Sequence, residues 1–234
     1  MTTFTTTSVP AQTRPRTTPR SRAWAWTGFA AAAAGLGGLI GSSLTTAVYD
    51  ESTSGDAEGI LATLANQTPQ LLAFHVLTMV GVVLLPVAAA GLHRRLSDRL
   101  PEGSLHGPVA AAGLLLVAVA GLMGAGLNTE FLFGVAQPEL LVPESAAFYG
   151  HWVGTIPWLW VGAGVTGLAL AAAAFRHRAV PRWIGVVALV LGALTVLFGV
   201  SPLQYMAAMT APPMLLAVFL GFALGDRETA SARV

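Results

Sequence analysis

The 234-residue sequence contains no cysteine, and all twelve of its basic residues are arginine. The absence of cysteine excludes disulfides, thiolate metal sites and iron–sulfur clusters. Charged residues are also scarce, at 10%, whereas 54% of the residues are hydrophobic. A soluble domain of this size needs more charge to cover its surface, so the composition predicts an integral membrane protein. The exclusive use of arginine is typical of a GC-rich bacterial genome.

Long apolar runs account for most of the chain. Each is long enough to cross the hydrocarbon core of a bilayer as a helix. The sequence therefore predicts an all-α, polytopic transmembrane bundle over 23–226, with no separate soluble domain. We expect about six spans, at 23–48, 70–92, 107–129, 150–175, 182–200 and 204–225.

The arginines predict the topology of these spans. They form four clusters, which leave the stretches 23–93, 100–175 and 183–226 without any arginine. Cytoplasmic loops of membrane proteins retain arginine, because positive charge near a span sets its orientation. We therefore expect three out-and-back hairpins in the cell (plasma) membrane, with the N-terminus and the C-terminus both cytoplasmic.

The two ends of the chain are expected to lie outside the membrane. Residues 1–22 are rich in threonine, proline and arginine and predict a disordered cytoplasmic tail, and 227–234 would form a short cytoplasmic tail. A basic start before an apolar run is also typical of a signal peptide. This run continues to about Ala47, beyond the apolar region of a signal peptide, which favours an uncleaved first span.

Acidic and aromatic residues agree with this topology. The acids gather in the first two outer loops, as Asp50, Glu51, Asp56 and Glu58 and then as Glu130, Glu139 and Glu144. Aromatic residues are enriched at membrane interfaces. The sequence predicts such a belt at the outer boundary, formed by Tyr49, Tyr149, Trp152 and Tyr205.

Small residues and prolines interrupt the apolar runs. The segment 162–167 matches the GxGxxG dinucleotide pattern, but it lies within a predicted span, where small residues favour close helix packing. Glycines 185, 192 and 199 recur every seven residues and predict a second close contact. Pro86, Pro157 and the pair Pro212–Pro213 should kink their helices, and the pair should break the sixth span near its middle.

Polar residues at one depth suggest a functional site. His75, Asn128, Glu130, His151 and Gln204 fall at comparable outer positions of separate spans. Ionisable groups in a membrane usually face the bundle interior or a water-filled cavity, because lipid exposure is costly. We hypothesise an outward-open pocket in which Glu130 pairs with His75 or His151. The alternative is that Asp50, Glu130 and His151 are interfacial residues in contact with headgroup water.

No cofactor or metal is predicted. Haem ligation by facing histidines is disfavoured, because the histidines of the second and fourth spans are not equally spaced. The arginines flank membrane spans and form no basic face for nucleic acid. The expected partners are the lipid bilayer, a small lipophilic or cationic ligand, and either a second copy of the chain or another membrane protein.

The segment Val180-Pro181-Arg182-Trp183-Ile184-Gly185 resembles the start of the fifth span in a group of uncharacterised bacterial multi-pass proteins, classed only as a domain of unknown function. The resemblance implies six or so helices and a long first outer loop with an acidic start and a short helix. Here Tyr49-Asp50-Glu51 would be the acidic start, and Gly59–Leu64 the short helix. The group carries no agreed catalytic residues, so the resemblance transfers no site.

Three functions remain open from the sequence. The leading hypothesis is a module that binds or translocates a small ligand at the polar site near the outer leaflet. The second is a membrane-embedded enzyme that uses the His/Glu cluster as acid and base. The third is a structural or partner-binding membrane subunit.

Overall fold

The computed structural model describes residues 22–225, and every regular element in that range is a helix. The predicted tails at 1–22 and 227–234 lie outside the described residues, apart from Arg22. Six of the helical segments are long and apolar enough to cross a membrane. The prediction of an all-α membrane bundle is therefore confirmed.

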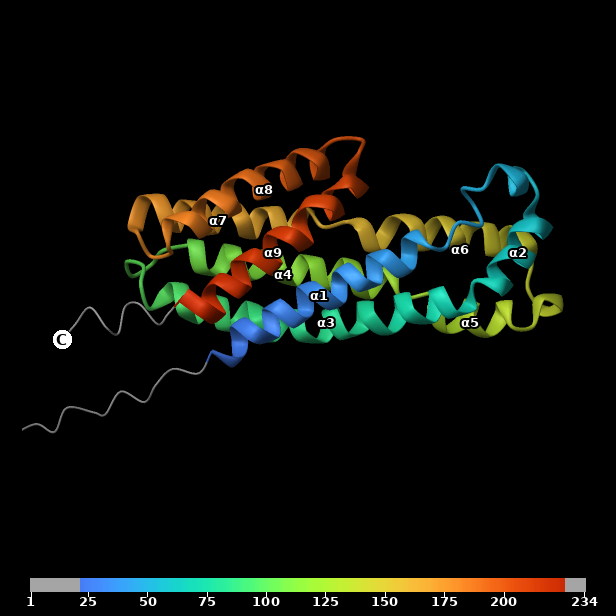
Figure 1. The fold of residues 1–234 in the computed structure, drawn as a ribbon, viewed down its shortest axis with the longest axis horizontal. Coiled ribbons are helices and arrows are strands. Elements are labelled where there is room, and N and C mark those ends of the chain that lie inside the picture. Colours follow the sequence, from blue (N-terminus) through green and yellow to red (C-terminus); the bar gives the residue numbers. More distant parts are fainter. Residues whose placement is uncertain (1–21, 226–234) are drawn as a thin grey trace, which may run out of the picture.

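The long helices of the bundle lie side by side along the long axis of the molecule (Figure 1) and pack in chain order as a closed ring. Each contacts the next, and the last returns to the first. The three hairpins of the sequence prediction are the pairs α1 with α3, α4 with α7, and α8 with α9. Their bounds are α1 Ala23–Ser43, α3 Thr68–Ser97, α4 His106–Gly124, α7 Val161–His177, α8 Arg182–Val200 and α9 Ala207–Gly225.

Short helices gather at the opposite end of the molecule from the start of α1 and the end of α9 (Figure 1). They are η1 Glu51–Thr53, α2 Ala57–Asn66, α5 Asn128–Val135, η2 Pro138–Leu140 and α6 Pro143–Thr155. We call this group, with the first turns of α3, the cap. The short helix expected at Gly59–Leu64 lies within α2.

The length of α3 sets the cap apart from the bundle. Its 30 residues span about 45 Å, whereas the hydrocarbon core of a bilayer is about 30 Å thick. Counted from Arg95, about twenty residues cross the core, which brings the far boundary to His75. The first turns of α3 therefore extend past this length, and α2 and α5 contact α3 there, while α6 packs against α2.

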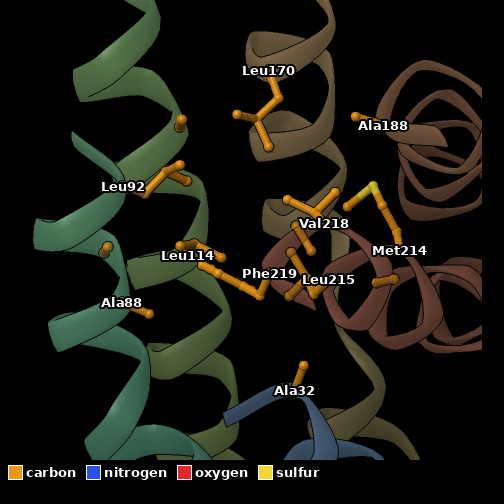
Figure 2. Close-up of a cluster of buried hydrophobic side chains, with 14 of the residues drawn as sticks. Ala32, Ala88, Leu92, Leu114, Leu170, Ala188, Met214, Leu215, Val218 and Phe219 are labelled. Atoms are coloured by element: carbon orange, nitrogen blue, oxygen red, sulfur yellow. The ribbon is translucent and has the colours of Figure 1, made fainter. Parts of the chain in front are cut away.

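Two separate hydrophobic cores follow from this arrangement. The larger one fills the bundle, where Figure 2 shows Leu114 of α4 close to Phe219 of α9, with Leu215 and Val218 beside them. The smaller one holds the cap together and includes Leu64, Phe74, Phe131 and Tyr149. The cap core was not predicted from the sequence.

Glycines bring α7 and α8 into backbone contact, as the sequence predicted. A Cβ added to Gly167 would lie 2.8 Å from the carbonyl oxygen of Ala188 and 3.0 Å from the Cα of Gly192. A Cβ added to Gly164 would lie 2.9 Å from the carbonyl oxygen of Gly192. The segment 162–167 is thus a helix-packing surface within α7 rather than a nucleotide-binding turn.

The prolines act differently from one another. The chain between α6 and α7 leaves the helical path at Pro157, which lies in η3 Ile156–Trp158. Pro86 lies inside the continuous helix α3. The prediction that Pro212 and Pro213 break the last span is wrong, because α9 is continuous through both. Their missing amide donors fall in the second turn of α9, close to its beginning, where few helical hydrogen bonds precede them.

The described charges lie at opposite ends of the molecule. The helix ends beside the start of α1 and the end of α9 form the Arg-rich end. It carries two acids, Asp98 and Glu102, and seven described arginines: Arg22, Arg94, Arg95, Arg99, Arg176, Arg178 and Arg182. The described residues of the cap include no arginine. Its acids are Asp50, Glu51, Asp56, Glu58, Glu130, Glu139 and Glu144. The charge asymmetry predicted from the sequence is therefore present in the fold.

Candidate functional site

A chain of polar side chains crosses the junction between the bundle and the cap. Tyr149 donates its hydroxyl proton to Asn128 Oδ1 over 3.0 Å. The amide nitrogen Nδ2 of Asn128 lies 3.1 Å from His75 Nδ1. Tyr149 and Asn128 are completely buried, and His75 is half-buried. We call these three residues the His75 site.

Each member of the His75 site comes from a different helix. His75 lies on α3 at the level where that helix leaves the hydrocarbon core. Asn128 is the first residue of α5, immediately after the break that ends α4 at Gly124. Tyr149 lies on α6, where its ring stacks on Phe131 with ring centroids 4.5 Å apart and an angle of 3° between the planes. The cap core therefore fixes the hydroxyl group that orients Asn128.

The hydrogen-bond directions define the tautomer of His75. Asn128 accepts at Oδ1 from Tyr149, so its Nδ2 group is the donor toward His75. A neutral His75 then accepts at Nδ1 and carries its proton on Nε2. This leaves the Nε2–H group of His75 as the donor available to a ligand.

An open apolar face of α3 runs from the His75 site toward the middle of the bundle. It is formed by residues of α3 alone: His75, Val76, Met79, Val80, Val83 and Leu84. The three valines are 43–66% exposed, so this face of α3 is in contact with lipid rather than with other helices. His75 therefore joins a buried polar network to a lipid-facing apolar surface.

The other three residues predicted for the site lie elsewhere on the surface. Glu130 on α5, His151 on α6 and Gln204 at the start of η4 Gln204–Met206 are all exposed. His151 contacts the ring of Tyr49 edge-on, with ring centroids 5.7 Å apart. Asn128, rather than Glu130, is the hydrogen-bond partner of His75.

Metal binding finds no support in the arrangement of these groups. Within residues 22–225, no three histidine, aspartate or glutamate side chains are placed so that they could hold a metal ion. The sequence predicts Glu130 as the partner of His75 or His151 and gives Asn128 only as a supporting polar group at the same depth. The wider pocket that included Glu130 and His151 does not form.

The prediction that Tyr149 belongs to an interfacial belt is wrong. Its side chain is completely buried, whereas Tyr49 and Tyr205 are exposed. Sequence position alone could not separate these residues, since all three fall near the same boundary. The only signal for burial was the small residues Ala146 and Gly150, which are also buried on α6.

A second polar contact ties the cap to α1. Ser42 donates its hydroxyl proton to the backbone carbonyl of Val153 over 2.7 Å, and accepts a hydrogen bond from Trp158 Nε1 at 2.9 Å. Ser42 is buried. The Ser42 hydroxyl is thus hydrogen-bonded both to α6 and to the irregular segment that follows α6.

The breaks in the third and fourth spans lie against each other. A Cβ added to Gly124, the last residue of α4, would lie 2.9 Å from the backbone nitrogen of Pro157. Beneath the breaks is a cavity of about 20 Å³, lined on one side by Thr78, which lies one turn of α3 below His75. A cavity of this size holds roughly one water molecule.

Two ionisable groups outside the spans have shifted pKa values. Although the Tyr49 side chain is exposed overall, partial desolvation of its hydroxyl raises its pKa above the usual range, and the nearby Tyr205 adds to this effect. Hydrogen bonds from the Ser52 hydroxyl and the Ser52 amide lower the pKa of the Asp50 carboxyl. These bonds make Asp50 the cap of η1, which fixes the chain just after α1.

Comparisons of this chain with protein-family models, curated proteins and solved structures find no match. The geometry of the site is therefore the basis for inferring function.

Proposed function

We propose that the protein binds a lipophilic molecule with a polar head at the His75 site. The observation that carries this proposal is the position of His75, which joins a buried hydrogen-bonded pair to the open apolar face of α3. The apolar part of the ligand would lie along Val76, Val80 and Val83. Its polar head would accept a hydrogen bond from His75 Nε2.

The burial of Asn128 and Tyr149 supports this proposal. Burying polar groups costs free energy unless they are hydrogen-bonded, and here each satisfies the other. Their hydrogen bonds hold the imidazole of His75 in one orientation and one tautomer. A ligand would then meet a donor that is already oriented, which lowers the entropic cost of binding.

Binding, rather than translocation, is the activity that the bundle interior favours. The space between the helices below the His75 site is filled by apolar side chains such as Leu114 and Phe219 (Figure 2). The cavity under the helix breaks has room for roughly one water molecule. Passage of a ligand would need the helices to separate.

A partner-binding role is the second candidate, and one observation favours it. The segment from α5 to α6 exposes large apolar side chains to the surroundings of the cap: Phe133, Leu140, Val142 and Phe148, which are 56–74% exposed. Large apolar side chains exposed together often mark an interaction surface. Substitution of these residues by serine would weaken assembly with a partner and leave the His75 site intact.

We further propose that the Arg-rich end faces the cytoplasm, with the protein in the cell membrane. The separation of arginines and acids between the two ends supports this orientation. Because the sequence has no cysteine, single cysteines at Ser54 and Glu102 would be the sole thiols. A membrane-impermeant maleimide added to intact cells should label Ser54→Cys and spare Glu102→Cys. The reverse pattern would overturn the orientation.

The ligand proposal is tested by photolabelling in membranes. The probe is a long-chain alcohol with a diazirine in its alkyl chain, which combines an apolar tail with a hydroxyl head. We expect covalent labelling to concentrate on Val76, Val80 and Val83, located by mass spectrometry of the peptides. His75→Phe should reduce the labelling of these residues severalfold, because it removes the Nε2 donor and keeps a ring.

The matched control is His151→Phe, which changes another histidine of the cap that lies outside the His75 site. This variant should label as the original protein does. Equal labelling of the two variants, or labelling spread evenly over the lipid-facing residues, would overturn the proposal. The thermal stability of both variants, measured in the same detergent, would reveal a loss of folding.

A further inference from the structure

A groove on the outer surface of the bundle begins at the Arg-rich end. It runs between α4, α7 and α8 and has a volume of about 350 Å³. Its apolar walls include Val109 of α4, Val165 and Leu168 of α7, and Val196 of α8. His106, near the beginning of α4, also lines this groove.

Polar groups from two helices meet at this histidine. The ring of His106 contacts the ring of His177 edge-on, with centroids 5.2 Å apart and an angle of 74° between the planes. Ser104 Oγ lies 2.8 Å from His106 Nδ1, which holds the ring of His106 in place. His177 is the last residue of α7, so the contact connects the ends of two antiparallel neighbours.

Arginines lie next to His177 in the sequence. Arg176 and Arg178 flank His177 and are both exposed. Arg178 ends α7 in the left-handed conformation, with φ of 55°, and Arg182 begins α8 four residues later. Glu102, in the loop before α4, is the nearest acid in the sequence. The excess of arginines over acidic residues at this end therefore favours the binding of an anion.

We infer that this groove binds a phospholipid with an anionic headgroup. One acyl chain lies along Val109, Val165 and Leu168, and the phosphate lies at the pair His106–His177. The histidines donate hydrogen bonds, while Arg176 and Arg178 supply the charge. Basic pockets between membrane helices recognise anionic lipids in this way.

The arrangement of apolar and basic groups points to a lipid rather than to a soluble anion. A free phosphate would use the basic groups alone and would leave the groove without a role. A zwitterionic lipid would fill the groove but would gain less from Arg176 and Arg178, since its own positive charge opposes theirs. The combination of groove and charge thus defines the ligand class.

The test is native mass spectrometry of the full-length protein in detergent. Equal amounts of dioleoyl phosphatidylglycerol and dioleoyl phosphatidylcholine are added, and the fraction of protein carrying each lipid is measured. We expect the original protein to prefer phosphatidylglycerol. Arg176→Gln/Arg178→Asn should reduce that preference by about fivefold for each charge removed. Asparagine tolerates the left-handed conformation at Arg178, so this variant should fold.

The matched control is Arg94→Gln/Arg99→Gln, which removes the same charge from the same end but from the neighbourhood of α3. This control variant should keep most of the preference for phosphatidylglycerol over phosphatidylcholine. A third variant, Leu168→Trp, fills the groove without changing the charge. It should reduce binding of phosphatidylglycerol, and millimolar inorganic phosphate should not displace the lipid from the original protein.

Three results would overturn the inference. The first is equal binding of both lipids by the original protein, and the second is an equal loss in both arginine variants. The third is unchanged binding in Leu168→Trp together with displacement by inorganic phosphate, which would indicate a soluble anion. None of these results depends on the His75 site, so the two proposals fail separately.

Discussion

Tyr149 donates a hydrogen bond to Asn128 over 3.0 Å, and neither side chain has any solvent exposure. The replacement Tyr149→Phe keeps the ring stacked on Phe131 but leaves the amide oxygen of Asn128 buried without its donor. We expect the free energy of unfolding to fall by about 1–3 kcal/mol. Thermal denaturation followed by circular dichroism in detergent would measure this change.

The control for this variant is Tyr205→Phe, since Tyr205 is 43% exposed. Removing its hydroxyl should change stability by less than about 0.5 kcal/mol, as is usual for surface positions. Equal losses in the two variants would show that the contact between Tyr149 and Asn128 does not stabilise the cap.

Because α7 and α8 approach closely at Gly167, we expect a side chain at this position to destabilise the bundle. A methyl group there would lie 2.8 Å from a backbone oxygen and 3.0 Å from a backbone Cα, so the two helices would have to separate. We expect Gly167→Ala to destabilise the bundle by about 1–3 kcal/mol. The matched variant is Gly225→Ala, where an added Cβ meets nothing within 4 Å. A melting temperature that is the same in both variants would contradict the packing argument.

Ser42 predicts an energetic coupling between α1 and the segment after α6. Ser42→Ala removes both the donor to Val153 and the acceptor for Trp158 Nε1. The variants Ser42→Ala and Trp158→Phe, alone and combined, form a double-mutant cycle. We expect a coupling energy of about 0.5–3 kcal/mol from equilibrium unfolding. Additive effects would mean that the hydrogen bond between the two side chains contributes no measurable stability.

The pKa of Asp50 predicts a change with pH at the start of the cap. Hydrogen bonds from Ser52 lower this pKa, so their contribution to stability is present above the usual carboxyl range and is lost as the pH falls through the lowered pKa. Ser52→Ala removes the hydroxyl donor and should raise the pKa of Asp50 toward its usual value. Titration of the Asp50 side-chain carbon resonance in labelled protein would measure the shift. An unchanged midpoint would show that the hydroxyl does not lower this pKa.

The sequence was sufficient to predict six apolar helices long enough to cross a membrane. It also placed His75 and Asn128 at similar levels of neighbouring helices, by a count of helical rise. It did not identify Tyr149 as the partner of Asn128, because burial of a tyrosine near a boundary depends on which helices surround it.

The effects of the prolines also depended on tertiary contacts. Pro86 is exposed on a lipid-facing part of α3, where the helix continues past it. Pro157 is buried against Gly124, and its carbonyl accepts a hydrogen bond from Trp160 Nε1 at 2.9 Å. Neighbouring groups thus stabilise the irregular backbone at Pro157, and a sequence pattern does not reveal such neighbours.

The two hydrophobic cores give the molecule two units that can open separately. The cap core is assembled from short helices beyond the hydrocarbon thickness, whereas the bundle core is enclosed by long helices. Amides of α2 and α5 should therefore exchange with deuterium before those of α7 and α9, because local opening of the cap exposes less apolar surface than opening of the bundle. Urea acts mainly on the part in water, so unfolding should proceed in two stages. Loss of the cap would leave the bundle in place but would separate His75 from the groups that orient it.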